Sequence, residues 1–223
     1  MNYSMDFSFL TRYQNLYITG TRNTILLAFL AVFFGVILGL VLALMRRSNF
    51  KPLQFVATAY IEFVRGTPLL VQLFIIFYGL PVVTGMRFPD FVAGVIALSL
   101  NSAAYVAEII RAGLQSVDRG QMEAARSLGM PNKMAMRYII IPQAFKNILP
   151  ALGNEFIVVI KESAIVSIIG IYDIMRSANI VRGITYRPFE PLIVAAVIYF
   201  LLTFTLSNLL GIAERRMRAG DSH

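Results

Sequence analysis

The sequence lacks several residues on which enzyme and metal chemistry commonly depend. It contains no cysteine, and its single histidine is His223, close to the C-terminal end. The absence of cysteine excludes disulfides, thiolate metal ligands and thiol nucleophiles. One terminal histidine argues against a histidine-based catalytic centre or metal site. We therefore expect neither catalytic residues nor a metal site in this chain.

Charged residues are also scarce, at 14% of the chain, whereas 57% of its residues are hydrophobic. Soluble domains carry about 25% charged and about 45–50% apolar residues. Most of the surface is therefore suited to lipid or to other helices in lipid. The net charge of +8 is better explained by basic loops that orient a membrane protein than by nucleic-acid binding. The sequence also has no GxxxxGK[ST] loop, so we expect no bound ATP or other cofactor in this chain.

Long apolar segments divide the chain into spans and loops. A helix of about 20 residues crosses the hydrocarbon layer at 1.5 Å per residue. We predict one all-α integral membrane domain over residues 1–223, with a polar cytoplasmic loop at 113–146. Its five transmembrane helices are expected at about 22–46, 55–80, 90–112, 147–169 and 188–214.

Basic residues are distributed unequally between the two sets of loops that five spans create. Twelve lie in 46–54, 111–146 and the C-terminal segment, against six in the N-terminal segment, 80–90 and 170–190. Cytoplasmic loops carry the excess of lysine and arginine. We therefore predict a multi-pass protein of the bacterial cytoplasmic membrane, with its N-terminus outside and its C-terminus in the cytoplasm.

The polar loop itself contains the pattern of two short helices. Good helix formers run from Arg119 to Leu128, and Gly129 is placed as a C-cap. A second, basic helix is expected from about Asn132, ending at Pro142. Two readings stay open at this point: an amphipathic element lying on acidic lipid head groups, and a folded surface for docking another protein.

Polar side chains recur inside the predicted spans, where they usually face a bundle interior or a water-filled cavity. Asn101 lies roughly 15 Å into the third span, and Glu155 lies roughly 12 Å into the fourth. Gln72, in the outer half of the second span, is expected to reach the same depth. No basic residue lies three or four positions from Glu155. We hypothesise that Glu155 pairs with a cationic solute, with Asn101 and Ser102 supplying hydrogen bonds; a structural role for Glu155 is the alternative.

Further polar residues surround Glu155 on the same span. Glu162 lies seven residues on and shares its helical face, while Asn154 and Lys161 share the neighbouring face. We count Asn154 and Glu162 among the candidate substrate contacts. For Lys161 and Glu162, mutual neutralisation or pairing with a second subunit is the favoured reading over substrate contact.

Two carboxylate–arginine pairs at a spacing of three lie elsewhere in the spans. Glu62 and Arg65 are expected to pair locally, with gating or helix packing as the alternative role. Glu108 and Arg111 have the same spacing and receive the same interpretation.

The polar loop also carries a family resemblance. Glu123-Ala124-Ala125, Gly129, Ile139 and Ile141-Pro142 resemble the EAA motif of ABC-importer permeases, with Ile141 where the family usually has leucine. The segments 62–72, 104–111 and 141–144 are similar to polar amino-acid permeases. The resemblance covers nearly the whole chain and is greatest for the group that serves arginine and other basic amino acids. Similar permeases for neutral amino acids tend to carry an uncharged residue at the position of Glu155.

This resemblance implies a specific set of partners and roles. The helix around Glu123, Ala124 and Ala125 would sit in a cleft of an ATP-binding subunit, with Glu123 as a polar anchor and Gly129 as the turn. A dimer of that subunit would bind ATP and Mg. A second permease subunit, either a copy or a paralogue, would complete the path through the lipid bilayer, and an extracytoplasmic amino-acid-binding protein would deliver the cargo. The alternatives are a stand-alone secondary transporter or channel, and a membrane-embedded enzyme.

Overall fold

The computed structural model describes residues 5–219, and every regular element in that range is helical. Nine α-helices are joined by a π-helical turn, η1, and a 3-10 segment, η2. In chain order they are α1 (Phe9–Arg46), α2 (Lys51–Gly66), α3 (Leu69–Thr84), α4 (Asp90–Gln115), α5 (Arg119–Ser127), α6 (Asn132–Ala135), η1 (Met136–Ile140), α7 (Ile141–Glu162), η2 (Ser163–Ile169), α8 (Ile174–Thr185) and α9 (Glu190–Ala219).

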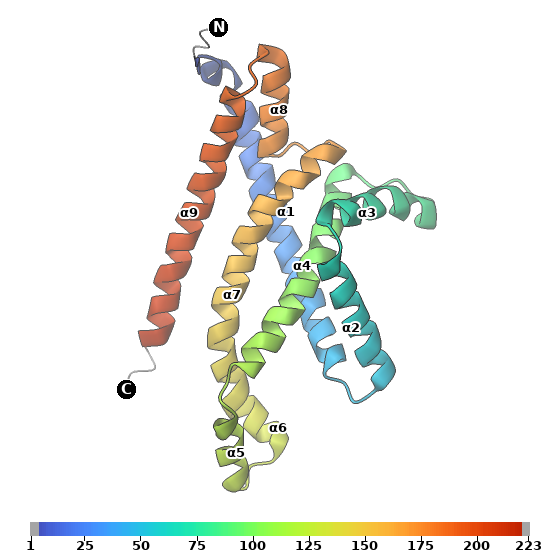
Figure 1. Ribbon diagram of the computed structural model, residues 1–223, viewed down its shortest axis with the longest axis vertical. Coiled ribbons are helices and arrows are strands. Elements are labelled where there is room, and N and C mark those ends of the chain that lie inside the picture. The colour runs from blue at the N-terminus through green and yellow to red at the C-terminus, as the bar shows by residue number, and fades with distance from the viewer. Residues whose placement is uncertain (1–4, 220–223) are drawn as a thin grey trace.

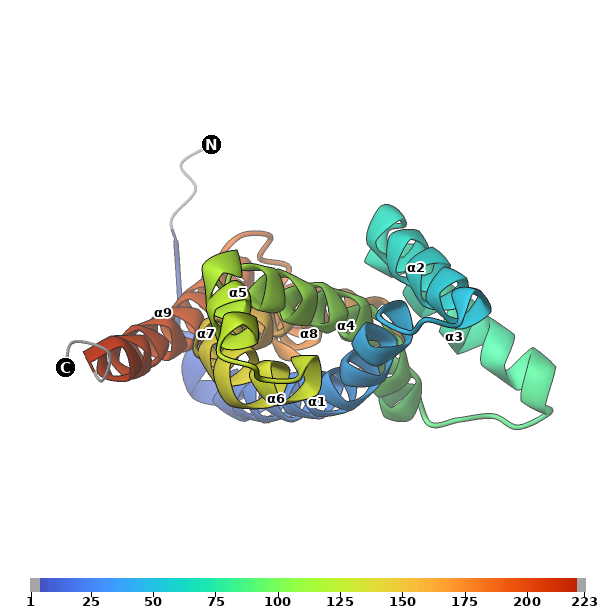
Figure 2. The same cartoon turned by 90° about the horizontal axis from the view of Figure 1, so that it is seen from below.

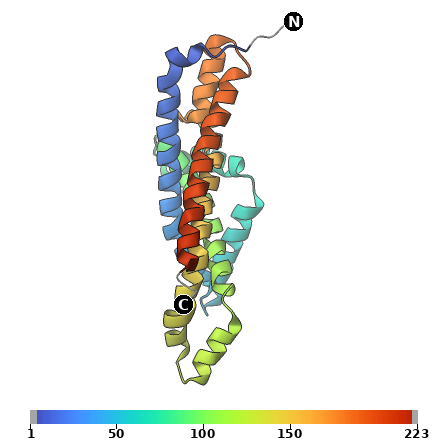
Figure 3. The same ribbon diagram turned by 90° about the vertical axis from the view of Figure 1, so that its left-hand side faces the viewer.

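Four long helices, α1, α4, α7 and α9, run along the longest dimension of the molecule (Figure 1). The short helices α5 and α6 form one end, and α8 lies with the start of α1 at the opposite end (Figures 1 and 3). Seen from below, α2 and α3 stand on one side of the bundle and α9 on the other (Figure 2). The arrangement therefore separates the polar loop from the N-terminal end by the full length of the bundle.

Small residues allow α1 and α4 to make the most extensive contact of any helix pair in the fold. A Cβ atom on Gly35 would lie 2.9 Å from Ser102 Cβ, and one on Gly39 would lie 2.7 Å from Val106 Cβ. Small residues at a spacing of four let helix backbones approach closely in lipid. Around this contact, the main core gathers buried side chains of α1, α3, α4, α7 and η2, among them Leu27, Leu73, Leu98 and Ile160.

The predicted spans are confirmed in part. Three helices, α1, α4 and α9, are each long and apolar enough to cross a membrane, and α2 with α3 passes the same test together as a bent pair, which is either a broken span or a re-entrant loop. The predicted span at 147–169 falls on α7 and η2, which are helical but contain several polar residues among the apolar ones. The count of five therefore stays a prediction. The helix predicted from residue 22 begins earlier, at Phe9, because no proline interrupts the segment before it.

The second span is broken where Gly66, Thr67 and Pro68 interrupt the apolar sequence, and the axes of α2 and α3 meet at 112°. Thr67 is extended (φ −119°, ψ 148°), as expected for a residue that precedes proline. Pro68 serves as the N-cap of α3, a place where its missing N–H leaves no helical bond unmade. The single helix expected at about 55–80 is therefore two separate helices joined by a sharp bend.

The prediction that Pro142 ends the second short helix is wrong. The chain passes from α6 through the π-helical turn η1 into α7, and Pro142 lies in the first turn of α7. Proline suits the start of an α-helix because its fixed φ is already helical, and the preceding Ile141 N–H bonds to the Met136 carbonyl across the π turn. The wider π turn that precedes Pro142 accommodates the ring without ending the helix.

Candidate translocation site and coupling surface

A buried polar strip crosses the core at the level of Asn101 and Ser102 on α4. The Ser102 hydroxyl donates a 2.8 Å hydrogen bond to Glu155 Oε1 on α7, and Asn101 Nδ2 donates a 2.9 Å bond to Gln72 Oε1 on α3. All four side chains are at most 9% exposed. The structure thus pairs Ser102 with Glu155 and Asn101 with Gln72. The sequence predicted a common depth for Asn101, Glu155 and Gln72, and a hydrogen-bonding role for Ser102.

Glu155 has a hydrogen bond but no countercharge. Within residues 5–219, its carboxylate forms no ion pair with a lysine or arginine, and Ser102 is its hydrogen-bond donor. A buried carboxylate is costly unless it is paired and hydrogen-bonded. The site therefore has the chemistry to receive a cationic group.

Gln72 has a second function that the sequence did not indicate. Its Nε2 donates to the Val64 carbonyl at 2.7 Å and to the Thr67 carbonyl and hydroxyl at 3.1 and 3.0 Å. Carbonyl groups at the end of a helix have no intrahelical donor. Gln72 thus satisfies backbone groups freed by the break between α2 and α3, while its carbonyl oxygen orients Asn101.

The remaining candidates on α7 lie outside the strip. Asn154 and Lys161 are exposed, on the face next to that of Glu155, and Glu162 is half-buried. The structure therefore does not gather these three residues with Asn101 and Ser102. An exposed lysine on a helix in this position faces either lipid or another subunit.

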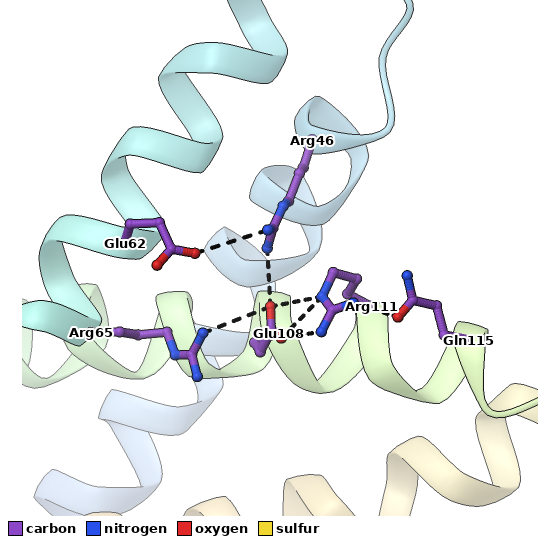
Figure 4. A network of polar contacts seen from close by, with 6 residues as sticks. All are labelled: Arg46, Glu62, Arg65, Glu108, Arg111 and Gln115. Carbon is purple, nitrogen blue, oxygen red and sulfur yellow. Dashed lines mark hydrogen bonds and ion pairs between the residues drawn. The ribbon is translucent and has the colours of Figure 1, made fainter.

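A cluster of charges joins the C-terminal parts of α1, α2 and α4 (Figure 4). Glu108 accepts from Arg111 Nε at 3.0 and 2.9 Å and from Arg46 Nη1 at 3.0 Å, and it lies 3.9 Å from Arg65 Nη1. Glu62 Oε1 lies 4.0 Å from Arg46 Nη2. The predicted Glu108–Arg111 pair is confirmed. The ion pairs shown for Glu62 and Arg65 instead run to other helices, because α2 faces α1 and α4 across this cluster.

The polar loop at 113–146 is folded at the tip of the molecule (Figure 1). Asp118 Oδ1 accepts a 2.7 Å bond from the Gly120 N–H at the start of α5. At its end, Gly129 adopts a left-handed conformation (φ +84°), and the Met130 N–H bonds to the Ala125 carbonyl at 3.1 Å. This is the glycine C-cap that the sequence predicted. Ala125 is buried, whereas Glu123, Ala124 and Gly129 are exposed, so α5 presents two of the three motif residues outward.

Toward the opposite end, two buried acidic residues, Asp173 and Glu190, lie at the starts of α8 and α9. Asp173 is 1% exposed, and its Oδ1 accepts a 2.7 Å bond from the Arg176 N–H at the start of α8. Burial raises the pKa of Asp173 to about 6, partly offset by its hydrogen bonds. Beyond the C-terminal end of α8, Arg187 contacts Glu190 at 3.0 Å and Asp6 at 2.6 Å. These contacts tie the start of the chain to the α8–α9 connection.

The site offers recognition chemistry rather than bond-making chemistry. It consists of a carboxylate, a hydroxyl and two amides, which accept and donate hydrogen bonds. Within residues 5–219, no group of three or more His, Cys, Asp or Glu side chains is arranged to hold a metal ion. The arrangement suits the recognition of a polar solute.

Known proteins agree with this interpretation. Residues 35–219 match the family described as binding-protein-dependent transport system inner membrane component. The arginine transport system permease protein ArtQ of Bacillus subtilis (strain 168) is 44% identical over 218 residues, covering 98% of this chain and all of the relative. A putative glutamine transport system permease protein, GlnP of Rickettsia conorii, is 45% identical over 200 residues, covering 90% of this chain and 92% of the relative.

Solved structures extend the comparison to the fold. A chain in a crystal structure of an amino acid ABC transporter with histidines is 59% identical, with a TM-score of 0.92, covering 96% of this chain and all of the other. A chain of the MetNI methionine ABC transporter in an inward-facing conformation has a TM-score of 0.76 at 19% identity, covering 96% of this chain and 99% of the other, which shows a shared fold alone. Together with the family match, these relatives show that this chain belongs to the polar amino-acid ABC transporter permeases, the non-catalytic inner membrane components of binding-protein-dependent importers.

Proposed function

We propose that this chain forms the membrane path for a basic amino acid, with Glu155 contacting the cationic side chain of the cargo. The observation that carries the proposal is a buried carboxylate with one hydroxyl donor and no countercharge. The neighbouring Asn101 and Gln72 supply amide groups of the kind that bind an amino-acid backbone. The relatives support a cargo of this class, since one is named for arginine and a related structure is described with histidines.

The proposal is tested by exchanging charge at constant shape. Glu155→Gln keeps a group that accepts from Ser102 but removes the negative charge. In reconstituted transporter, we expect this variant to lose most of its preference for arginine and lysine over glutamine. Glu162→Gln is the matched comparison, because it removes a half-buried carboxylate from the same helix. An unchanged preference in Glu155→Gln would refute the role of Glu155, and a loss seen only in Glu162→Gln would transfer that role to Glu162.

The same proposal includes an orientation and a set of partners. The α5 tip would face the cytoplasm and dock into an ATP-binding subunit through Glu123, Ala124 and the Gly129 turn, while the α8 end faces outward toward a binding protein. A second permease subunit, identical or paralogous, would cover the exposed face of α7 that carries Asn154 and Lys161. ATP and Mg would be bound by the ATPase dimer, not by this chain.

Orientation has a direct test because the chain contains no cysteine of its own. Leu128 and Tyr186, at opposite ends, are 85% and 91% exposed. We expect an impermeant maleimide applied to intact cells to label Tyr186→Cys, and to label Leu128→Cys only after the membrane is permeabilised. The reverse pattern would invert the proposed topology.

A further inference from the structure

An apolar groove separate from the polar strip lies between α1, α4 and the start of α7. It has a volume of about 440 Å³, within the range of roughly 300–1,000 Å³ found for ligand pockets. Apart from one residue, all of its lining side chains are apolar. The lining comes from Val36 to Leu44 on α1, Ile110 and Leu114 on α4, and Met136 to Leu152 on η1 and α7, with Arg47 at one end.

The groove opens onto an exposed apolar surface. Its rim residues Leu40, Leu44, Ile141 and Phe145 are 48%, 63%, 46% and 52% exposed. Exposed apolar side chains continue from it along α1. A hydrocarbon chain in the bilayer therefore has direct access to the groove without crossing polar surface.

The length of the groove corresponds to one leaflet. Along α1 it runs from Val36 to Arg47, and along α7 from Ile141 to Leu152, so α7 would enter the leaflet six residues before the start of the span predicted at 147. Eleven residue steps at 1.5 Å give roughly 16 Å in each case. Half of the hydrocarbon layer is about 15 Å thick. An acyl chain that enters at the Arg47 end would thus be covered over the depth of its own leaflet.

Arg47, at one end of the groove, favours a lipid with an anionic head group. Arg46 is engaged by Glu108 at 3.0 Å, whereas the next residue, Arg47, is exposed and forms no ion pair within residues 5–219. An arginine presents several donors in a fork that matches phosphate oxygens. In the orientation proposed above, on which this inference rests, Arg47 stands at the cytoplasmic interface, where anionic lipids are found.

We propose that this groove is a binding site for one anionic membrane phospholipid, with an acyl chain along α1 and α7 and the head-group phosphate on Arg47. The site shares no residue with the polar strip of Glu155, Asn101 and Ser102. It contacts both the start of α7 and the η1 turn that leads from the coupling loop. The lipid would therefore fill the space between α1 and the helix that joins the coupling loop to the polar strip.

The test measures lipid binding on the purified complex of this chain with its ATP-binding subunit. The complex is stripped of lipid in detergent and titrated with phosphatidylglycerol, with phosphatidylcholine as the neutral comparison, and binding is followed by native mass spectrometry. Arg47→Gln should weaken the binding of phosphatidylglycerol about five-fold, which is the effect of one basic residue near an anionic membrane surface. Arg216→Gln, an exposed arginine near the end of α9, is the matched control and should bind as wild type.

A second variant acts on the acyl part of the site. Leu40→Trp fills the rim of the groove and should weaken the binding of both lipids. Leu38→Trp lies on α1 but outside the groove lining, and it should leave the binding of both lipids unchanged. Equal binding by Arg47→Gln, Leu40→Trp and their controls would overturn the proposal. So would a photoactivatable cross-linker on Leu40→Cys that captures another subunit of the complex, because protein would then occupy the groove. Neither readout requires transport, so failure here is distinct from failure of the Glu155 proposal.

Discussion

The charge cluster around Glu108 gives a quantitative prediction for Glu108→Gln. As built, three arginines and two glutamates give the cluster a net charge of 3 − 2 = +1. Removing the Glu108 charge raises it to +2 and leaves Arg46, Arg65 and Arg111 facing a neutral amide. The three helices that meet there lose their shared anion, so the expected effect is a loss of stability rather than a local change.

The size of this loss of stability follows from how far the ion pair is exposed to solvent. Exposed ion pairs contribute about 0–1 kcal/mol, whereas removing one partner of a buried pair costs about 3–5 kcal/mol. The side chains of Arg46 and Glu108 are 24% and 21% exposed, so solvent screens this pair partly. We expect Glu108→Gln to lower the free energy of unfolding by about 2 kcal/mol, which corresponds to a fall of roughly 4–8 °C in the unfolding midpoint.

The assay is thermal unfolding of the detergent-purified protein, followed by loss of the monodisperse peak in size-exclusion chromatography. Glu123→Gln is the control, since Glu123 is exposed on α5 and a surface substitution is expected to stay within about 0.5 kcal/mol. A double-mutant cycle with Arg46→Gln should yield a coupling of about 1–2 kcal/mol. Equal midpoints for the two glutamate variants, or a coupling near zero, would refute the assignment of Glu108 as the shared anion.

Three further predictions concern packing, the coupling turn and pH. A Cβ on Gly113 would lie 2.3 Å from Ile148 Cγ1, so Gly113→Ala should cost about 1–3 kcal/mol alone and much less in an Ile148→Ala background; additive midpoint shifts would contradict this. Gly129→Ala forces φ +84° on an alanine at about 1–2 kcal/mol, so it should weaken co-purification of the ATPase subunit while Gly129→Asn largely preserves it. For Asp173, whose pKa is raised from 3.8 to about 6 by burial, the folded state binds the extra proton. Stability should therefore fall as the pH rises from about 4 to 6, by on the order of 2–3 kcal/mol, and Asp173→Asn should remove this dependence.

Local chemistry made much of the fold and site predictable. The Gly129 cap, the separation of the coupling loop and the common depth of Asn101 and Glu155 all depend on residue type and spacing along one or two helices. Those features need no knowledge of how distant helices pack. Family resemblance supplied the function, and the family match agrees with it.

Features set by the packing of separate helices were not predictable in the same way. Spacing suggested a local Glu62–Arg65 pair, but the contacts shown run from Glu62 to Arg46 and from Arg65 to Glu108, because α2 leans on α1 and α4. Bracing of the α2–α3 break by Gln72 also depends on the direction in which α3 leaves Pro68. A signal for the α1–α4 contact was present in Gly35 and Gly39, whose spacing of four marks a close helix approach.

The continuity of α7 has a mechanical consequence. Because Pro142 does not end the helix, Glu155 lies on the same rod that leaves the coupling loop, fourteen residues and roughly 21 Å from Ile141. A displacement imposed at the loop therefore reaches the carboxylate as the movement of a stiff lever. One point of compliance within this rod is Pro150, where one backbone hydrogen bond is missing. The position of that proline thus determines how much of a push becomes translation of the carboxylate and how much becomes bending.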